Sequence, residues 1–181
     1  MEGHARGAIW SANNEDEVQI REVYSRYGLA MYQAQVLEHG MVNAVIIARM
    51  LPSMSQHADR TGWEEAFDRA YDAELAKTFG NMLRAVEALG LPDNFMAGLR
   101  AAKVERDRLV HRFFREHHES FLGKVGRTRM IAECEDTIER FIAIDAQLEA
   151  FMRPQRERYG ITVEWVESHL VAAIAAATAN S

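Results

Sequence analysis

The stretch IAECEDTIERFIAIDAQLEAFM, residues 131–152, decides the fold class of this chain. One stripe of it alternates spacings of three and four: Ile131, Cys134, Ile138, Phe141, Asp145, Leu148 and Met152. This alternation follows the α-helical turn, so it predicts a helix that buries the stripe against other helices. Asp145 is the one polar member of the stripe. Cys134, the single cysteine of the chain, is expected to be a small buried apolar residue.

Segments on the N-terminal side of this stretch show the same spacing, and we expect helices over residues 15–50, 61–89 and 93–118. Pro52 ends the first of them, because proline disfavours helix at the residue before it. Thr61 and Glu64 have the spacing of a capping box at the start of the second. Asp93 can cap the third.

After Pro154 and Gly160, Thr162 can cap a last helix that runs into an alanine-rich tail. Long amphipathic helices joined by short connectors must cover each other's apolar stripes. The predicted fold is therefore all-α: an antiparallel four-helix bundle with an additional C-terminal helix. We expect residues 1–14 to be a flexible N-terminal segment and residues 15–178 to form a single helical domain.

Composition limits the classes of function. The chain has 181 residues, of which 48% are hydrophobic and 27% charged, with a formal net charge of −6. These values are typical of a folded globular protein, and the negative charge argues against coating nucleic acid by bulk electrostatics. The apolar runs 41–48 and 170–177 are too short to cross a bilayer. Residues 1–10 lack the pattern of a secretory signal, so we expect a cytoplasmic protein without membrane association.

Residues 100–118 form a locally basic segment within this acidic chain. They contain six Lys and Arg against three Asp and Glu, a local charge of +3, and three histidines in addition. A solvated charged face explains most such segments. However, Arg106 falls in phase with apolar residues, and a buried guanidinium needs a partner. Glu38 and Asp145 are the candidate partners in a purely structural ion pair.

The core of this segment is ERDRLVHRFF, residues 105–114. It resembles the signature of the HEPN superfamily, helical proteins many of which are ribonucleases, in which an Arg is followed by a polar residue and then by a His. Arg106, Asp107 and His111 match that signature residue by residue. The resemblance implies a homodimer with a composite active site. Some toxins of the family carry Tyr two residues after the His, where a partner enzyme modifies it, whereas this chain has Phe113.

The residues also suit the chemistry of metal-independent RNA cleavage. His111 can act as general base or acid and Arg106 can stabilise the phosphorane. Asp107 lies four residues before His111 on a helix, where it can orient the imidazole. Arg106 lies about 140° round the helix from His111, so one helix does not easily direct both groups at one phosphate, whereas two copies related by a twofold axis could. The expected products carry 2′,3′-cyclic phosphate and 5′-hydroxyl ends.

Four further residues are candidates for holding RNA phosphates: Arg108, Arg112, Arg115 and His117. The leading hypothesis is thus a HEPN-type endoribonuclease that acts as a toxin or defence effector and is neutralised by an antitoxin protein. The first alternative is a catalytically inactive HEPN-like dimer that binds RNA or a partner protein. The second is a helical interaction module in which Arg106 and Asp107 only pair internally.

No cofactor or metal is expected. A ferritin-like dimetal bundle needs Glu-x-x-His pairs, and none of the seven histidines has Glu three residues before it. The sequence also lacks a phosphate-binding glycine loop and a nucleophile elbow.

Overall fold

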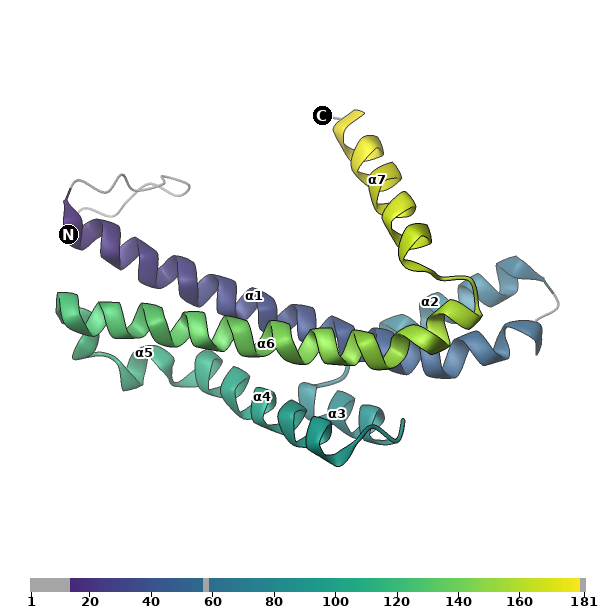
Figure 1. The fold of residues 1–181 in the computed structure, drawn as a ribbon, viewed down its shortest axis with the longest axis horizontal. Helices are drawn as coiled ribbons and strands as arrows, with labels where there is room; N and C mark the ends of the chain where they lie inside the picture. Colours follow the sequence, from purple (N-terminus) through teal and green to yellow (C-terminus); the bar gives the residue numbers. More distant parts are fainter. Residues whose placement is uncertain (1–13, 57–58, 180–181) are drawn as a thin grey trace. The chain divides into compact units, whose positions relative to one another are not determined.

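The computed structural model describes residues 14–56 and 59–179. Within these residues the chain forms seven α-helices and two short 3-10 helices, and no strand (Figure 1). They are α1 (Glu15–Met50), η1 (Leu51–Gln56), α2 (Arg60–Leu75), α3 (Phe79–Glu87), α4 (Asp93–His111), α5 (Phe113–Glu116), η2 (Ser120–Leu122), α6 (Lys124–Arg158) and α7 (Val163–Ala179). The all-α prediction is confirmed. Most of the predicted flexible N-terminal segment, residues 1–13, lies outside the described residues.

The contacts of the chain divide it into two units. Unit 1 combines the residues up to Gln35 with Ala101–Ile142, and unit 2 combines Val36–Arg100 with the residues from Ala143 onward. The helices α1, α4 and α6 each contribute residues to both units. The prediction of a single domain over residues 15–178 stays a prediction.

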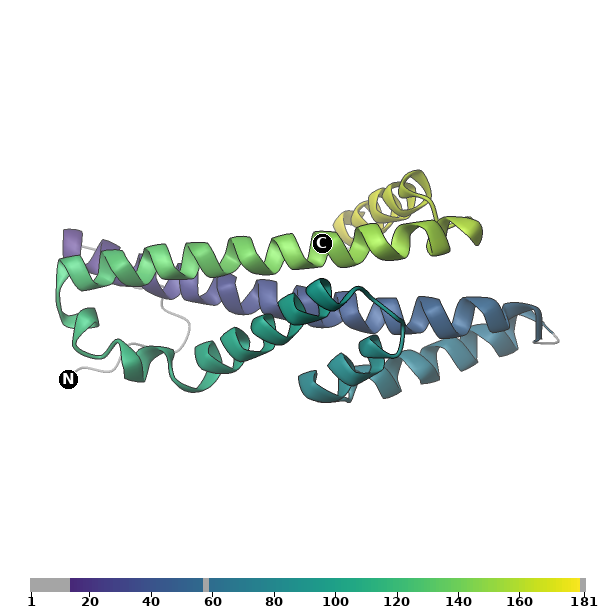
Figure 2. The ribbon, with the colours of Figure 1, turned by 60° about the horizontal axis from the view of Figure 1, so that its bottom comes forward.

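In unit 1, the first half of α1 and the first half of α6 lie side by side (Figures 1 and 2). The buried guanidinium of Arg127 joins them. Its Nε donates to Gln19 Oε1 at 2.9 Å, it forms an ion pair with Asp16, and its Nη1 donates to the Phe121 carbonyl at 3.1 Å. A buried arginine requires this full set of acceptors. Sequence analysis did not identify it.

The core of unit 1 follows the predicted stripe of α6. Cys134, Ile138 and Phe141 are buried, as are Val23 and Ala30 of α1. Burial and the nearby Glu133 raise the pKa of the Cys134 thiol to about 12, so the thiol is protonated at neutral pH. The expectation of a buried apolar cysteine is confirmed.

The core of unit 2 comes from the second halves of α1 and α6 together with α3 and the start of α4. Its buried side chains include Met41 and Val45 of α1, Val86 of α3 and Leu148 of α6. Gly40 allows a close approach here, because a Cβ at this position would overlap the carboxylate of Asp145. Burial and Glu149 raise the pKa of Asp145, the polar member of the stripe.

The prediction of one helix over residues 61–89 is wrong, because the chain forms two helices there. Thr78 has an extended backbone and caps α3 by accepting a hydrogen bond from the Asn81 amide, at 3.4 Å. This cap competes with continuation of α2 through residues 76–78. The capping box at Thr61 is also wrong. Asp59 is the N-cap of α2, and its carboxylate accepts from the Gly62 amide at 2.7 Å.

The predicted helix over residues 93–118 ends at His111, since Arg112 leaves the helical conformation before the short α5. The helix α6 continues to Arg158 although Pro154 lies inside it. Pro154 removes one hydrogen bond to the carbonyl of Ala150, and both residues are exposed, so water can replace the lost donor. The predicted Thr162 cap of the last helix is confirmed: its hydroxyl accepts from the Trp165 amide at 3.2 Å.

Candidate functional site

Aromatic contacts hold the end of α4, where the HEPN-like residues lie. The hydroxyl of Tyr27 donates to the Leu109 carbonyl at 3.2 Å. The ring centroid of Tyr27 lies 5.4 Å from that of Phe113 and 4.9 Å from that of Phe114. Neighbouring side chains of a regular helix point about 100° apart. The break at Arg112 lets both phenylalanines contact one tyrosine, and it sets the position of His111 at the last turn.

Asp107 is engaged by cations of its own helix. Its Oδ2 accepts from Lys103 Nζ at 2.6 Å, and its Oδ1 accepts from Arg106 Nη1 at 3.2 Å. The hydrogen bond from Lys103 is the largest reason that the pKa of Asp107 is lowered. In residues 14–56 and 59–179 no hydrogen bond or ion pair joins Asp107 to His111, so the expected orienting contact is not formed in this structure.

The guanidinium of Arg106 is partly accessible, with 28% of its side chain exposed. Glu38 and Asp145, the structural partners expected from the sequence, belong to unit 2, and the pairing of Arg106 with either of them stays a prediction. Within unit 1 Arg106 pairs with Asp107, its neighbour in the chain. The α-helix is regular over these residues, so Arg106 and His111 leave α4 in directions about 140° apart, as predicted.

Arg108 lies at the centre of a group of charged and polar side chains that contact one another. We call this group the Arg108 network: Glu105, Arg108, Glu116, His117, Glu133 and Thr137. Arg108 contacts Glu105 at 2.8 Å and Glu116 at 3.0 Å, and it also pairs with Glu133 of α6. Only 18% of its side chain is exposed. These carboxylates raise the pKa of the guanidinium above its ordinary value. The three carboxylates accept hydrogen bonds from the guanidinium N–H groups of Arg108 that would otherwise bind a phosphate.

His117 belongs to the same network. Its Nε2 lies 3.0 Å from Glu133 Oε2, its ring centroid lies 4.8 Å from that of Phe113, and 19% of its side chain is exposed. Sequence analysis did not identify Glu133 or Thr137. Their one signal in the sequence is their position beside the buried stripe, one residue before and three residues after Cys134.

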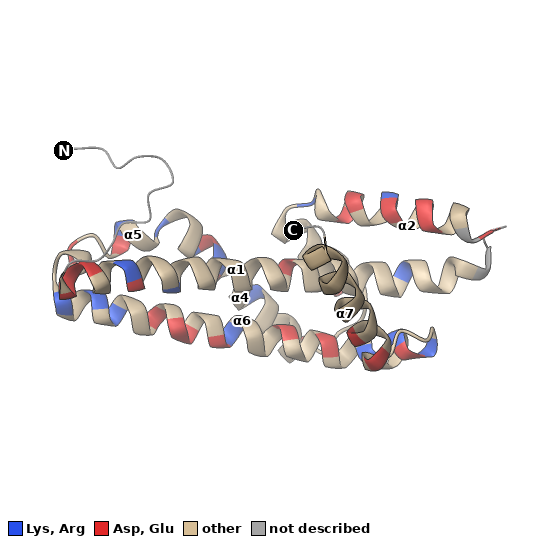
Figure 3. Cartoon of the chain, turned by 90° about the horizontal axis from the view of Figure 1, so that it is seen from above, with Lys and Arg blue, Asp and Glu red and all other residues tan. Residues whose placement is uncertain are grey.

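Three of the predicted site residues face solvent: His111, Arg112 and Arg115, which we call the open basic cluster. Arg112 makes only a long contact, 3.8 Å from Nε to Glu116 Oε1, with 58% of its side chain exposed. No ion pair within the described part of the chain involves His111 or Arg115. Figure 3 shows basic and acidic residues interspersed along α1 and α6 of the same unit. The structure thus divides the predicted phosphate contacts into an enclosed pair, Arg108 and His117, and an open set.

An apolar side chain lies on the same face of α4 as His111. Val104 is 63% exposed, and it precedes Asp107 by three residues and His111 by seven. These spacings place the three side chains on one face of the helix. An exposed valine between charged neighbours is a contact point available to another surface.

Comparisons of the chain with protein-family models, with curated proteins and with solved structures found no match. In residues 14–56 and 59–179 no three His, Cys, Asp or Glu side chains are grouped so that they could hold a metal ion. None of the helices described is both long and apolar enough to cross a membrane. The functional argument therefore depends on the geometry of α4 and its surroundings.

Proposed function

We propose that this chain is a metal-independent endoribonuclease of HEPN type, with an active site formed between two copies of the chain. The observation that carries this proposal is the exposure of His111 at the end of α4, with Arg106 of the same helix still partly accessible. A catalytic imidazole and a phosphate-binding guanidinium must both reach the substrate. Neither side chain is fully enclosed.

In this proposal His111 takes the proton of the RNA 2′-hydroxyl or donates one to the leaving 5′-oxygen. Arg106 stabilises the charge that develops on the phosphorane. Asp107 positions Arg106 through the 3.2 Å contact between them. Arg112 and Arg115 hold neighbouring phosphates, which is the salt-sensitive part of binding.

Two copies are needed because one helix directs Arg106 and His111 in different directions. A twofold arrangement would have to bring His111 of one copy toward Arg106 of the other. His111 is exposed and Arg106 is partly accessible, so both groups can be approached from outside the subunit.

The test is cleavage of mixed RNA by the purified full-length protein in excess EDTA. The His111→Ala and Arg106→Ala variants should each lose about 100-fold or more in rate. The products should accept 5′ phosphate from polynucleotide kinase without prior phosphatase treatment. His118→Ala is the matched control, because His118 is an exposed histidine of the same segment, with 72% of its side chain accessible. Equal activity of wild type and both site variants rejects the proposal.

Mixing the two inactive variants tests the composite site. If His111 and Arg106 act from opposite copies, each mixed dimer has one intact site, and random pairing should restore about a quarter of the wild-type rate. No recovery after exchange of subunits would contradict a site shared between copies.

The second candidate is a catalytically inactive helical dimer that binds RNA or a partner protein. The Arg108 network favours it, because carboxylates already occupy Arg108, a predicted phosphate contact, and His117 is only 19% exposed. This candidate predicts no cyclic-phosphate ends at any enzyme concentration and unchanged RNA binding in His111→Ala. We also propose, as expected from the sequence, that the helices form an antiparallel four-helix bundle with an additional C-terminal helix. We further propose that the protein is cytoplasmic and that an antitoxin protein binds it.

A further inference from the structure

Unit 2 contains a hollow remote in sequence from the HEPN-like residues. It has a volume of about 670 Å³ and lies where η1, the start of α2, the α6–α7 connection and the start of α7 meet. Six of its lining side chains are apolar or aromatic: Leu51, Met54, Trp63, Tyr159, Ile161 and Trp165. This volume lies within the range of small-molecule sites.

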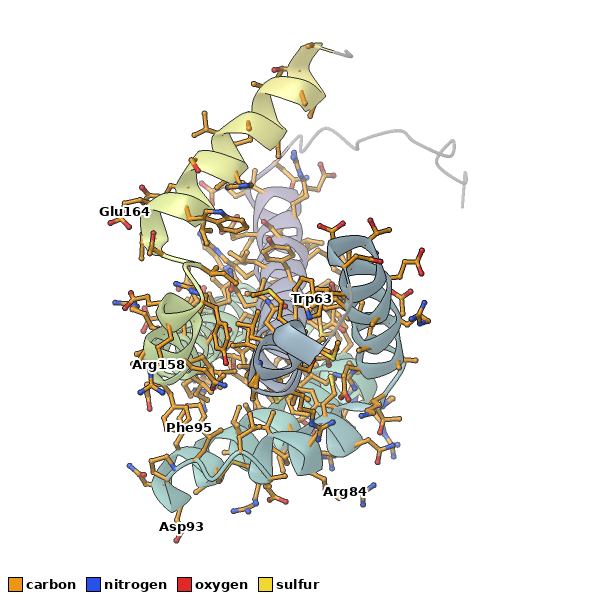
Figure 4. All side chains as sticks on the ribbon, turned by 90° about the vertical axis from the view of Figure 1, so that its right-hand side faces the viewer. Trp63, Arg84, Asp93, Phe95, Arg158 and Glu164 are labelled. Atoms are coloured by element: carbon orange, nitrogen blue, oxygen red, sulfur yellow. The ribbon has the colours of Figure 1, made fainter. Side chains whose placement is uncertain are left out.

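The aromatic side chains of this hollow are held in place and remain accessible. Trp63, which is labelled in Figure 4, is half-buried. Its Nε1 donates to the Met50 carbonyl at 3.4 Å, and its ring centroid lies 5.3 Å from that of Phe67. Trp165 stacks on His169 with centroids 3.8 Å apart and is 46% exposed. Tyr159 is 37% exposed. Exposed indole and phenol rings in a hollow offer π faces to a ligand.

The charged residues that line the hollow are both acidic, Asp59 and Glu64. An adjoining hollow of about 340 Å³ shares Trp63, Glu64 and Trp165 and adds Asp68 and Arg156. The guanidinium of Arg156 is committed to protein acceptors, since it pairs with Glu149 at 2.8 Å and donates to the Ile161 carbonyl at 3.0 Å. The formal charge of the side chains that line the larger hollow is therefore negative.

The helix that contributes Trp63 strengthens this potential. α2 carries five Asp and Glu against two Arg, a local charge of −3, and acidic positions predominate along it in Figure 3. Aromatic rings attract cations through their quadrupole, and nearby carboxylates add a Coulomb attraction. An anionic ligand would meet only like charge on the hollow's ionised lining groups.

We propose that this hollow binds a hydrophobic organic cation, an ammonium group carried on an aromatic or aliphatic body. The rings of Trp63, Tyr159 and Trp165 contact the ammonium methyl groups and the apolar body. Asp59 and Glu64 supply the opposite charge. The site does not depend on the proposed nuclease activity, because all of its residues belong to unit 2 and none belongs to the HEPN-like segment.

The experiment titrates the full-length protein with three matched probes by calorimetry and tryptophan fluorescence. They are benzyltrimethylammonium, its uncharged carbon isostere neopentylbenzene, and the anion phenylacetate. We expect the cation to bind about tenfold more tightly than the isostere, and phenylacetate not to bind at about 10 mM. Equal affinity for the cation and the isostere overturns the proposal, as does the absence of cation binding at about 10 mM.

Variants locate the site and separate its two contributions. Asp59→Asn removes a charge and keeps an N-cap of equal quality, so α2 should still form. Combined with Glu64→Gln it should weaken cation binding about tenfold and leave the isostere unaffected. Trp165→Leu should weaken the binding of both benzyltrimethylammonium and neopentylbenzene. Glu65→Gln is the control, because Glu65 lies on α2 outside the hollow and 66% of its side chain is exposed. Unchanged cation binding in both site variants overturns the proposal.

Discussion

Arg108 and the open basic cluster come from the same short stretch of chain but have opposite electrostatic surroundings. Arg108 contacts three carboxylates and is 18% exposed, whereas Arg112, four residues later, makes one contact at 3.8 Å and is 58% exposed. A run of like-charged residues on a helix is therefore not one functional surface. Arg108 is held in ion pairs with carboxylates of the fold, whereas Arg112 and Arg115 remain available to a ligand.

The difference arises from the partner helix. Glu133 of α6 reaches both Arg108 and His117, and it has no counterpart next to Arg112 or Arg115 in the described structure. Charge pairs that are shielded from water are strongly coupled, while exposed pairs contribute little to stability. Four measurements can sharpen or break this comparison.

The largest effect is expected from Arg108→Met. Removing the guanidinium deprives Glu105, Glu116 and Glu133 of the cation that all three contact. Breaking a fully buried pair costs about 3–5 kcal/mol, and the partial exposure of these carboxylates reduces this to about 2 kcal/mol in the free energy of unfolding. Urea denaturation measures it. Arg115→Met is the matched control, with a change within about 0.5 kcal/mol. Similar values for both variants would show that the network is not a stabilising unit.

Acid should weaken the network by a smaller amount, because Glu116 and Glu133 still face Arg108 when Glu105 is protonated. The hydrogen bond from Arg108 is the largest reason that the pKa of Glu105 is lowered from 4.5. A carboxylate with a lowered pKa contributes its full stability above its ordinary pKa and loses it as the pH falls through the lowered value. Denaturation curves below pH 4.5 should therefore show less loss of stability in Glu105→Gln than in wild type. Identical pH profiles would contradict this assignment.

Thr137→Val tests the buried edge of the network. Thr137 is fully buried, and its hydroxyl lies 2.9 Å from the Glu133 carbonyl and 3.3 Å from Glu105 Oε1. We expect a loss of about 1 kcal/mol, because the partly buried carboxylate of Glu105 loses a donor. Thr178→Val, at an exposed position of α7, should change the melting temperature very little. A neutral Thr137→Val would mean that Glu105 needs no donor besides Arg108.

The smallest effect on stability is expected in the open basic cluster. Arg112→Ala and Arg115→Ala should each change the free energy of unfolding by less than about 0.5 kcal/mol. If these side chains hold single-stranded RNA phosphates, each substitution should reduce the slope of log affinity against log salt by about 0.7. Fluorescence anisotropy with labelled RNA over a range of salt concentrations measures the slope. An unchanged slope in both variants would remove the cluster from the RNA contacts.

Much of the helical framework could be predicted because apolar spacing reports directly on which side of a helix is buried. The range of α1 and the stripe of α6 agree with the structure. The break between α2 and α3 was missed, since the apolar spacing continues through Thr78 while a local cap interrupts the backbone. Periodicity records which side chains are buried, and it is less sensitive to a single turn of changed backbone.

For the candidate site, the sequence identified the segment, but it did not predict which of its side chains form ion pairs and which are exposed. Arg106 and His111 were named with their different directions, and α4 is helical over both. The pairing of Asp107 with Lys103 was not predicted, because several cations lie within reach of this carboxylate along one helix. The enclosure of His117 depends on Glu133, which is distant in sequence.

The order of amino acids by itself determined the all-α class, the buried stripe of α6, the Thr162 cap and the position of the basic segment, because each follows from local spacing and short-range hydrogen bonding. Only the tertiary structure decided which arginines are neutralised, which face remains open, and that aromatic and acidic residues of η1, α2 and α7 line one hollow. These properties depend on side chains brought together from distant parts of the chain. A Coulomb energy or a cavity depends on distances in space, and sequence separation does not specify them.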